Sequence, residues 1–148
     1  MSLLRKDRWQ SIENLDLLEG GHDYFKVLEA SILGAKKSIY LETYIFSRDE
    51  QAKRIADLLC QAASKGLDVK VILDWLGSSN FSFEQEFLKS GVQLVHYNPS
   101  WFGRFGFSRT HRKLVVIDEA QAFVGGINIC ADNLSSDGEI LRGIRWDL

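Results

Sequence analysis

Residues Thr110–Asn133 read THRKLVVIDEAQAFVGGINICADN, and this stretch decides the expected fold. His111 and Lys113 stand two positions apart just before the apolar run LVVI, which is typical of a β-strand. Because side chains alternate between the two faces of a strand, both are expected on one face. A second apolar run, AFVGG, follows after Glu119 and Ala120. The two runs predict a β-hairpin.

If the two residues between the runs form the loop, the register of the hairpin follows. Lys113 then lies opposite Gly126, and His111 lies opposite Asn128. An imidazole, an ammonium and a carboxamide converge on one spot, and glycine leaves space beside them. This pattern indicates an oxyanion site that contains a nucleophile.

Asp118 has a different place in this geometry. It pairs with Gln121 and follows Lys113 by five residues. It therefore points to the opposite face of the strand, about 16 Å further along it. Direct contact with a substrate does not follow from this position. The register predicts that Asp118 stabilises a turn or a buried network.

The order His-x-Lys, four residues, Asp, six residues, Gly-Gly-x-Asn, at residues 111–128, resembles the signature of the phospholipase D superfamily. The rest of the chain, from about Leu15 onward, resembles the amino-terminal half of bacterial cardiolipin synthases. The similar pieces are LETYIF at Leu41–Phe46, VKVILDWLGS at Val69–Ser78, GVQLVHYNP at Gly91–Pro99 and RTHRKLVVID at Arg109–Asp118. A single phospholipase D-like domain over residues 1–148 is implied.

By this resemblance His111, Lys113 and Asp118 form the catalytic set, and Asn128 and Gly126 bind the phosphate. Superfamily active sites combine two such motifs across a pseudo-two-fold axis. One histidine attacks phosphorus and becomes a phosphohistidine, while the other protonates the leaving alkoxide. The resemblance implies no metal and no other cofactor.

Two further acidic residues are candidates for orienting the histidine. Asp147, in RWDL, matches by order and context an acidic residue that superfamily members carry downstream of the motif. Glu42 lies inside the apolar run SIYLETYIF, where a charge is costly unless it is paired. It could reach the histidine or the cationic cluster, or it could pair with a nearby Arg or backbone group for structure alone. Asp74, at the end of another strand, is expected to stabilise a turn.

The chain also shows alternating helical and strand patterns. The expected elements are a helix at His22–Leu33, a strand at Ser38–Phe46, a helix from the capping box of Ser47 and Glu50 through Ser64, a strand at Val69–Asp74, a short helix capped by Ser82 and Gln85 that ends at Gly91, and a strand at Val92–Tyr97. With the hairpin, this order predicts an α/β layered domain, in which a mixed β-sheet is flanked by helices on both faces.

Composition is that of one ordinary globular domain, with 148 residues of which 45% are hydrophobic. No run of about 18 apolar residues predicts a membrane span. Cys60 and Cys130 are isolated, so they indicate neither a disulfide framework nor a metal site. By resemblance, the expected place is the cytoplasmic side of a bacterial inner membrane, as a peripheral protein.

Positive charge gathers around the motif, because Phe87–Ile117 contains no Asp or Glu. An anionic substrate would require such a field; a solvated basic loop is the alternative. Asn98–Arg112 also carries aromatic side chains, which suit a phospholipid interface but would equally suit single-stranded nucleic acid or packing onto the domain itself. The residues concerned are Trp101, Phe102, Phe105, Phe107, Arg104 and Arg109.

Only one complete motif is present, since neither His22 nor His96 has a Lys two residues on. A second half is therefore expected on a carboxy-terminal segment or on an identical partner chain. The leading interpretation is a phosphatidyltransferase of the cardiolipin synthase type, which passes a phosphatidyl group to phosphatidylglycerol at a membrane surface. The alternative is a single-motif phosphodiesterase or nuclease that acts as a homodimer, and an inactive half-domain is a third reading.

Overall fold

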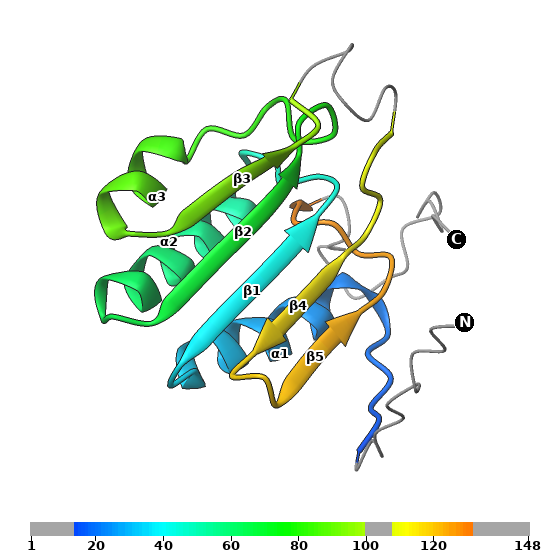
Figure 1. Cartoon of the computed structure of the whole chain (residues 1–148). Helices are drawn as coiled ribbons and strands as arrows, with labels where there is room; N and C mark the ends of the chain where they lie inside the picture. The colour runs from blue at the N-terminus through cyan, green and yellow to red at the C-terminus, as the bar shows by residue number, and fades with distance from the viewer. Residues whose placement is uncertain (1–13, 100–107, 132–148) are drawn as a thin grey trace, which may run out of the picture.

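The computed structural model describes residues 14–99 and 108–131 of the chain, which form one mixed β-sheet with helices packed on it (Figure 1). In chain order the elements are α1 (Gly20–Gly34), β1 (Ser38–Thr43), α2 (Glu50–Ser64), β2 (Asp68–Asp74), α3 (Glu84–Ser90), β3 (Gln93–Tyr97), β4 (Leu114–Ile117) and β5 (Gln121–Val124). The predicted α/β class and mixed sheet are confirmed.

The sheet has the strand order β3-β2-β1-β4-β5. Strands β1, β2 and β3 are parallel, whereas β4 runs antiparallel to β1 and β5 antiparallel to β4. The strand β1, expected to be central from its apolar run, has a neighbour on either side. Because β4 is antiparallel to β1, the amino end of β4 lies beside the carboxyl end of β1. That edge of the sheet carries the residues that precede β4.

The arrangement of layers differs from the expectation in the described ranges. All three helices lie on one face of the sheet, behind the strands in Figure 1. Ile39, Val71 and Val115 are buried on this face. The alternate positions are more open, and Ile72 and Val95 are 36% and 56% exposed. Two covered faces would require both sets of alternate side chains to be buried, so the described part of the sheet has one helical layer, not two.

The starts of α2 and α3 also differ from the prediction. The N-cap of α2 is Asp49, whose carboxylate accepts a hydrogen bond from the Ala52 N–H at 2.9 Å. Ser47 instead accepts from the Asp49 N–H at 3.1 Å, so the predicted capping box is wrong. Helix α3 begins after Phe83, with no side-chain cap. Its end at Gly91 is confirmed, because this glycine takes the left-handed conformation, with φ 89°.

A cluster of phenylalanines lies below the carboxyl edge of the sheet. Phe46, just after β1, contacts the rings of Phe81, Phe83 and Phe87 edge-on, with centroids 5.2 to 6.2 Å apart. Phe46 and Phe87 are fully buried. Aromatic pairs in this geometry add to the energy of burial. The chain that leaves β1 is therefore held firmly against α3 and the segment before it.

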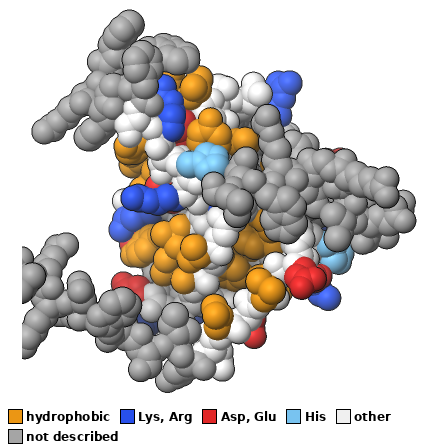
Figure 2. Space-filling view, turned by 90° about the vertical axis from the view of Figure 1, so that its right-hand side faces the viewer, with side chains coloured by type: hydrophobic (Ala, Val, Ile, Leu, Met, Phe, Trp, Pro, Cys, Tyr) orange, Lys and Arg blue, Asp and Glu red, His pale blue; other side chains and the backbone are white. Residues whose placement is uncertain are grey.

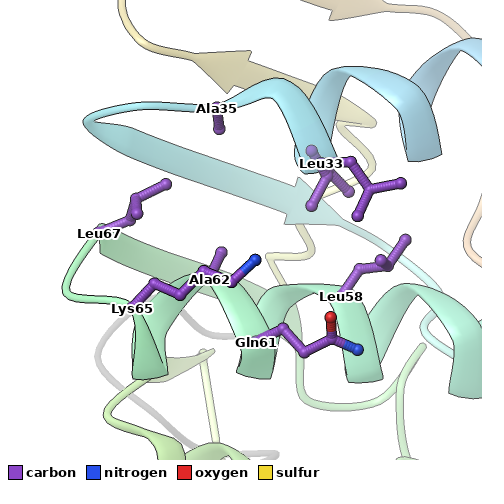
Figure 3. A pocket seen from close by; sticks show the side chains of 8 residues that line it. Leu33, Ala35, Leu58, Gln61, Ala62, Lys65 and Leu67 are labelled. Atoms are coloured by element: carbon purple, nitrogen blue, oxygen red, sulfur yellow. The ribbon is translucent and has the colours of Figure 1, made fainter.

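A small cavity lies at the other end of the sheet, between the carboxyl ends of α1 and α2 (Figure 3). Its wall includes Leu33, Leu58, Ala62 and Leu67. A volume of about 20 Å³ has room for roughly one water molecule. This cavity is too small for a substrate. Over the described ranges, no helix has the length and hydropathy needed to cross a membrane.

Candidate active site

His111 and Lys113 come together at the carboxyl edge of β1. The Lys113 ammonium lies 3.1 Å from Nδ1 and 3.0 Å from Nε2 of the His111 ring, and it donates to the His111 carbonyl oxygen at 3.2 Å. Lys113 is buried, with 6% of its surface exposed, whereas His111 is exposed. A buried cation thus stands beside an accessible imidazole. The sequence predicted that these two groups share one place, and the structure agrees.

The hairpin register differs by one residue from the expected one. Ile117, not Asp118, pairs with Gln121. The loop consequently has three residues, from Asp118 to Ala120, and the Ala120 N–H donates to the Ile117 carbonyl oxygen at 3.0 Å. Asp118 and Glu119 both have positive φ, at 55° and 56°. Asp118 leaves the strand because its backbone and side chain are bound elsewhere.

The corrected register changes the partners of the motif. Lys113 lies opposite Gly125, whose N–H donates to the Lys113 carbonyl oxygen at 3.3 Å, rather than opposite Gly126. Asn128 reaches the same edge of the sheet by another route. It is buried, and its carboxamide oxygen accepts from the Ile45 N–H at 3.2 Å. The carboxamide is therefore oriented by the chain that follows β1, not by pairing across the hairpin.

Asp118 lies at the opposite end of β4 from Lys113. Its carboxylate accepts three backbone N–H groups, from Lys36 at 2.8 Å, Lys37 at 2.7 Å and Ser38 at 2.9 Å. These hydrogen bonds, that of Ser38 first, hold the pKa of Asp118 below its usual value. The predicted turn role is confirmed. The structure places Asp118 away from His111, where it holds the start of β1, and its membership of the catalytic set stays a prediction.

Glu42 is bound to the residues that flank the histidine. Its carboxylate accepts a hydrogen bond from the Thr110 hydroxyl, and the Arg112 guanidinium lies 3.6 Å away. The side chain is 15% exposed. Thr110 and Arg112 alternate with His111 and Lys113 along the chain. These contacts favour the expected pairing with an arginine, and orientation of the His111 ring by Glu42 stays a prediction.

Asp74 stabilises a turn, as predicted, and it also binds the motif. It is fully buried, and one carboxylate oxygen accepts from the N–H groups of Leu76 and Gly77, at 3.0 and 2.9 Å. The other oxygen accepts from the Thr110 N–H at 3.0 Å. The backbone just before His111 is thereby fixed to β2. The link was missed because Asp74 and Thr110 are far apart in sequence; a carboxylate ending a buried strand was the available signal.

A further neighbour of the histidine, Tyr44, was missed by the sequence reasoning. Its ring centroid is 4.7 Å from that of His111, with the planes tilted by 56°. The Lys113 ammonium lies 5.6 Å from the centre of the same ring. The position could have been noticed as an aromatic residue directly after the strand that contains Glu42.

The ends of the aromatic and basic segment are fixed near the site. The Asn98 amide donates to the Ser108 carbonyl oxygen at 3.0 Å, and the Tyr97 hydroxyl lies 3.1 Å from the Ser108 hydroxyl. The side chains expected at an interface between these ends, from Trp101 to Phe107, lie outside the described residues. Asp147 also lies outside them.

Seen from the β5 side of the molecule, a histidine side chain is exposed with Lys and Arg side chains near it and apolar side chains below (Figure 2). In residues 14–99 and 108–131, no group of three or more His, Cys, Asp or Glu side chains could hold a metal ion. The arrangement offers a nucleophilic imidazole, a buried ammonium and a carboxamide at one edge of a sheet. Such groups can bind and attack a phosphate ester.

The fold is similar to that of two solved structures. Nuc from Salmonella typhimurium, a phospholipase D family member, superposes with a TM-score of 0.56 at 22% identity, covering 71% of this chain and 64% of that one. NucT from Helicobacter pylori gives a TM-score of 0.56 at 21% identity, with coverage of 76% and 70%.

In sequence, the chain is 37% identical over 139 residues to cardiolipin synthase B of Escherichia coli (strain K12), covering 90% of this chain and 34% of that protein. It is 36% identical over 121 residues to the major cardiolipin synthase ClsA of Bacillus subtilis (strain 168), covering 78% and 25%. The chain thus spans about a third or less of the length of these relatives. Residues 28–145 match the family described as cardiolipin synthase, PLD-like domain, and the chain therefore belongs to that family.

Proposed function

We propose that this chain is the amino-terminal catalytic half of a phosphatidyltransferase of the cardiolipin synthase type. The observation that carries the proposal is the Lys113 ammonium within 3.1 Å of the exposed His111 ring, in a domain 37% identical to cardiolipin synthase B. The substrates are phospholipids, so the protein acts at a membrane surface as a peripheral protein, on the cytoplasmic side.

The proposed reaction has two steps at phosphorus. A ring nitrogen of His111 attacks the phosphodiester of one phospholipid, so that an N–P bond forms and the P–O bond to the headgroup alcohol breaks. The histidine of a second motif gives its proton to that leaving alkoxide. It then takes a proton from a hydroxyl of phosphatidylglycerol, whose oxygen attacks phosphorus and breaks the N–P bond.

Lys113 and Asn128 hold the non-bridging phosphate oxygens while charge develops. Lys113 is suited to this because it is buried, so that its charge is less screened than at a surface. The carboxamide oxygen of Asn128 accepts from the Ile45 N–H. The amide nitrogen is then the end that can donate to an anion. Both groups are held before the substrate arrives, which is what stabilises a transition state.

The second motif comes from a carboxy-terminal segment or from an identical partner chain. The relatives support the first source, because cardiolipin synthase B is about three times as long as the region of it that matches. A partner chain would serve the alternative function, a single-motif phosphodiesterase or nuclease acting as a homodimer. The observation that favours this alternative is the presence of one motif in the 148 residues. The third reading is an inactive half-domain.

The experiment compares two substrates at several protein concentrations. The 148-residue chain is incubated with phosphatidylglycerol vesicles and, separately, with single-stranded DNA, while light scattering reports its mass. We expect cardiolipin to form once the second half is supplied, and little activity from a dilute monomer. The His111→Gln variant controls for contaminating enzymes. A fully active monomer would contradict the two-motif mechanism, and cleavage of DNA without lipid transfer would favour the alternative.

A further inference from the structure

We propose that Tyr44 is the residue that positions His111 and Lys113 relative to each other. Its ring contacts both groups, with the His111 ring at 4.7 Å and the Lys113 ammonium at 5.6 Å from its centroid. The second distance lies within the range in which an aromatic face attracts a cation. The two groups of the motif therefore share one aromatic support, which comes from the segment directly after β1.

The position of Tyr44 is set by the turn that follows β2. The Ser78 hydroxyl donates to the Tyr44 carbonyl oxygen at 2.9 Å and accepts from the Phe46 N–H at 3.0 Å. One buried hydroxyl thus holds the backbone on both sides of Ile45. This arrangement replaces the strand pairing that β1 loses after Thr43.

Gly77, in the same turn, lies directly against Tyr44. A Cβ atom at Gly77 would stand 2.7 Å from Cε2 and 2.8 Å from Cδ2 of the Tyr44 ring, and it would also meet the Tyr44 carbonyl oxygen. Real Cβ atoms do not approach other atoms so closely, because the repulsion is too large. The absence of a side chain at Gly77 is therefore what allows the ring to occupy its place.

The same turn controls the other side of the histidine through Asp74. This carboxylate holds the N–H groups of Leu76 and Gly77 within the turn and the N–H of Thr110 before the motif. One turn thus fixes both the backbone that carries His111 and the ring that packs on it. Preorganisation of this kind matters because small errors in the placement of a reacting group are costly.

The consequence for chemistry rests on the proposed function; the contact itself does not. An exposed imidazole that is free to rotate would sample several orientations, and most of them would not face a phosphate held by Lys113. The Tyr44 ring limits these orientations and keeps the ammonium close. We therefore expect loss of the ring to weaken anion binding and slow turnover, while the hydroxyl of Tyr44 contributes little.

The test uses His111 as its own reporter. The 148-residue chain contains three histidines, so ¹³C-labelled histidine gives three sets of ring signals, and His111→Gln identifies one of them. In Tyr44→Leu we expect the ring-current shift of the His111 signals to disappear. Binding of inorganic phosphate, followed by the same signals, should weaken by about three- to tenfold, as expected for loss of a cation–π contact. Tyr44→Phe keeps the ring and should retain both properties.

Two pairs of variants distinguish loss of the positioning of His111 from general destabilisation of the fold. Tyr40→Leu removes the tyrosine of β1 whose ring centroid lies 4.9 Å from the Lys70 ammonium, and it should leave the His111 signals unchanged. Gly77→Ala should shift these signals by moving Tyr44, whereas Gly34→Ala should not, because nothing lies within 4 Å of a Cβ atom there.

Each outcome decides a different question. Unchanged His111 signals in Tyr44→Leu would overturn the proposed contact, and altered signals with unchanged phosphate binding would overturn the positioning role. Failure of the unmodified chain to bind phosphate would contradict the proposed function. The signals of His111 would still report whether Tyr44 packs on it.

Discussion

The two ends of β4 carry different parts of one sequence motif, and these parts have different physical roles. At the amino end, Lys113 is buried and lies beside the exposed His111 ring. At the carboxyl end, the Asp118 carboxylate accepts three backbone N–H groups from the connection between α1 and β1. One end holds an exposed imidazole beside a buried ammonium, and the other end fastens the strand to its neighbour.

This difference teaches that a short motif can combine chemistry with the support that the chemistry needs. Asp118 fixes the residues at which β1 begins, and β1 ends at the edge of the sheet where Tyr44 meets His111. The strand between the two ends has four residues, from Leu114 to Ile117. Substitutions at the two ends should therefore affect different measurements.

The largest expected effect on turnover belongs to His111→Ala. Removal of the nucleophile should lower the rate by about 10⁴-fold or more, because the proposed covalent bond between His111 and phosphorus can no longer form. The melting temperature should change little, since the side chain is exposed. Initial rates and thermal unfolding of the same preparation check both statements. A residual rate above about a tenth would mean that another residue attacks phosphorus.

Lys113→Ala should come next, with a loss of about 10²–10³-fold in turnover. The ammonium provides charge to the phosphate oxygens only if it stays beside the imidazole, as it does at 3.0 Å. Because the side chain is buried, Lys113→Met is the better control for packing. Equal losses in both variants with equal melting temperatures would assign the effect to charge. Recovery in Lys113→Met would show that packing alone matters.

Asn128→Ala should lower both the rate of turnover and the stability of the fold. Its effects should therefore be intermediate between those of substitutions at the two ends of β4. The rate should fall by about 10²-fold, through loss of a donor to the phosphate. Stability should fall by about 1 kcal/mol or more, since the Ile45 N–H loses its acceptor in a partly buried place. Denaturant unfolding and rates measure the two effects. Asn128→Asp keeps the acceptor, so it should recover stability without recovering activity.

Asp118→Asn should have the smallest effect on the rate of the folded protein and a clear effect on its melting temperature. The amide group cannot accept three N–H groups as well as a carboxylate does, so the start of β1 is held less firmly. Asp57→Asn removes a carboxylate that forms an exposed ion pair with Lys53, and it should change the melting temperature much less. Loss of activity with an unchanged melting temperature would place Asp118 in the chemistry after all.

The effect of Asp118→Asn on the melting temperature should depend on pH. Hydrogen bonds hold the pKa of Asp118 below its ordinary value of 3.8, so the unfolded chain binds this proton more readily than the folded one. The stabilising effect is therefore complete above about pH 4 and is lost as the pH falls through the lowered pKa. The difference in melting temperature between the unmodified chain and Asp118→Asn should shrink between pH 4 and lower values. A constant difference would contradict this origin.

Much of the fold followed from local patterns. The parallel strands, the three helices and the central place of β1 could be predicted because buried runs and helical periodicity are local properties. Errors occurred where two local signals competed. Ser47 was chosen as the cap of α2, although Asp49 is the N-cap and also accepts from the Ala131 N–H, a contact between residues distant in sequence.

The hairpin register shows the same limit at the site. The positions of His111 and Lys113 were predicted correctly relative to each other because only two residues separate them. The loop was predicted one residue too short, since Asp118 is held away from the ladder by Lys36, Lys37 and Ser38. No pattern within the hairpin itself contains that information.

The sequence alone determined the α/β class and the family motif, because each depends on residue types at short, fixed spacings. Only the tertiary structure decided how the motif is supported. The Asp74 bond to Thr110 joins residues 36 positions apart, and the packing of Tyr44 on His111 joins residues still further apart along the chain. Such contacts depend on strand order and on space, such as the space left at Gly77. The spacing of residues within one motif gives neither the strand order nor the space around a side chain.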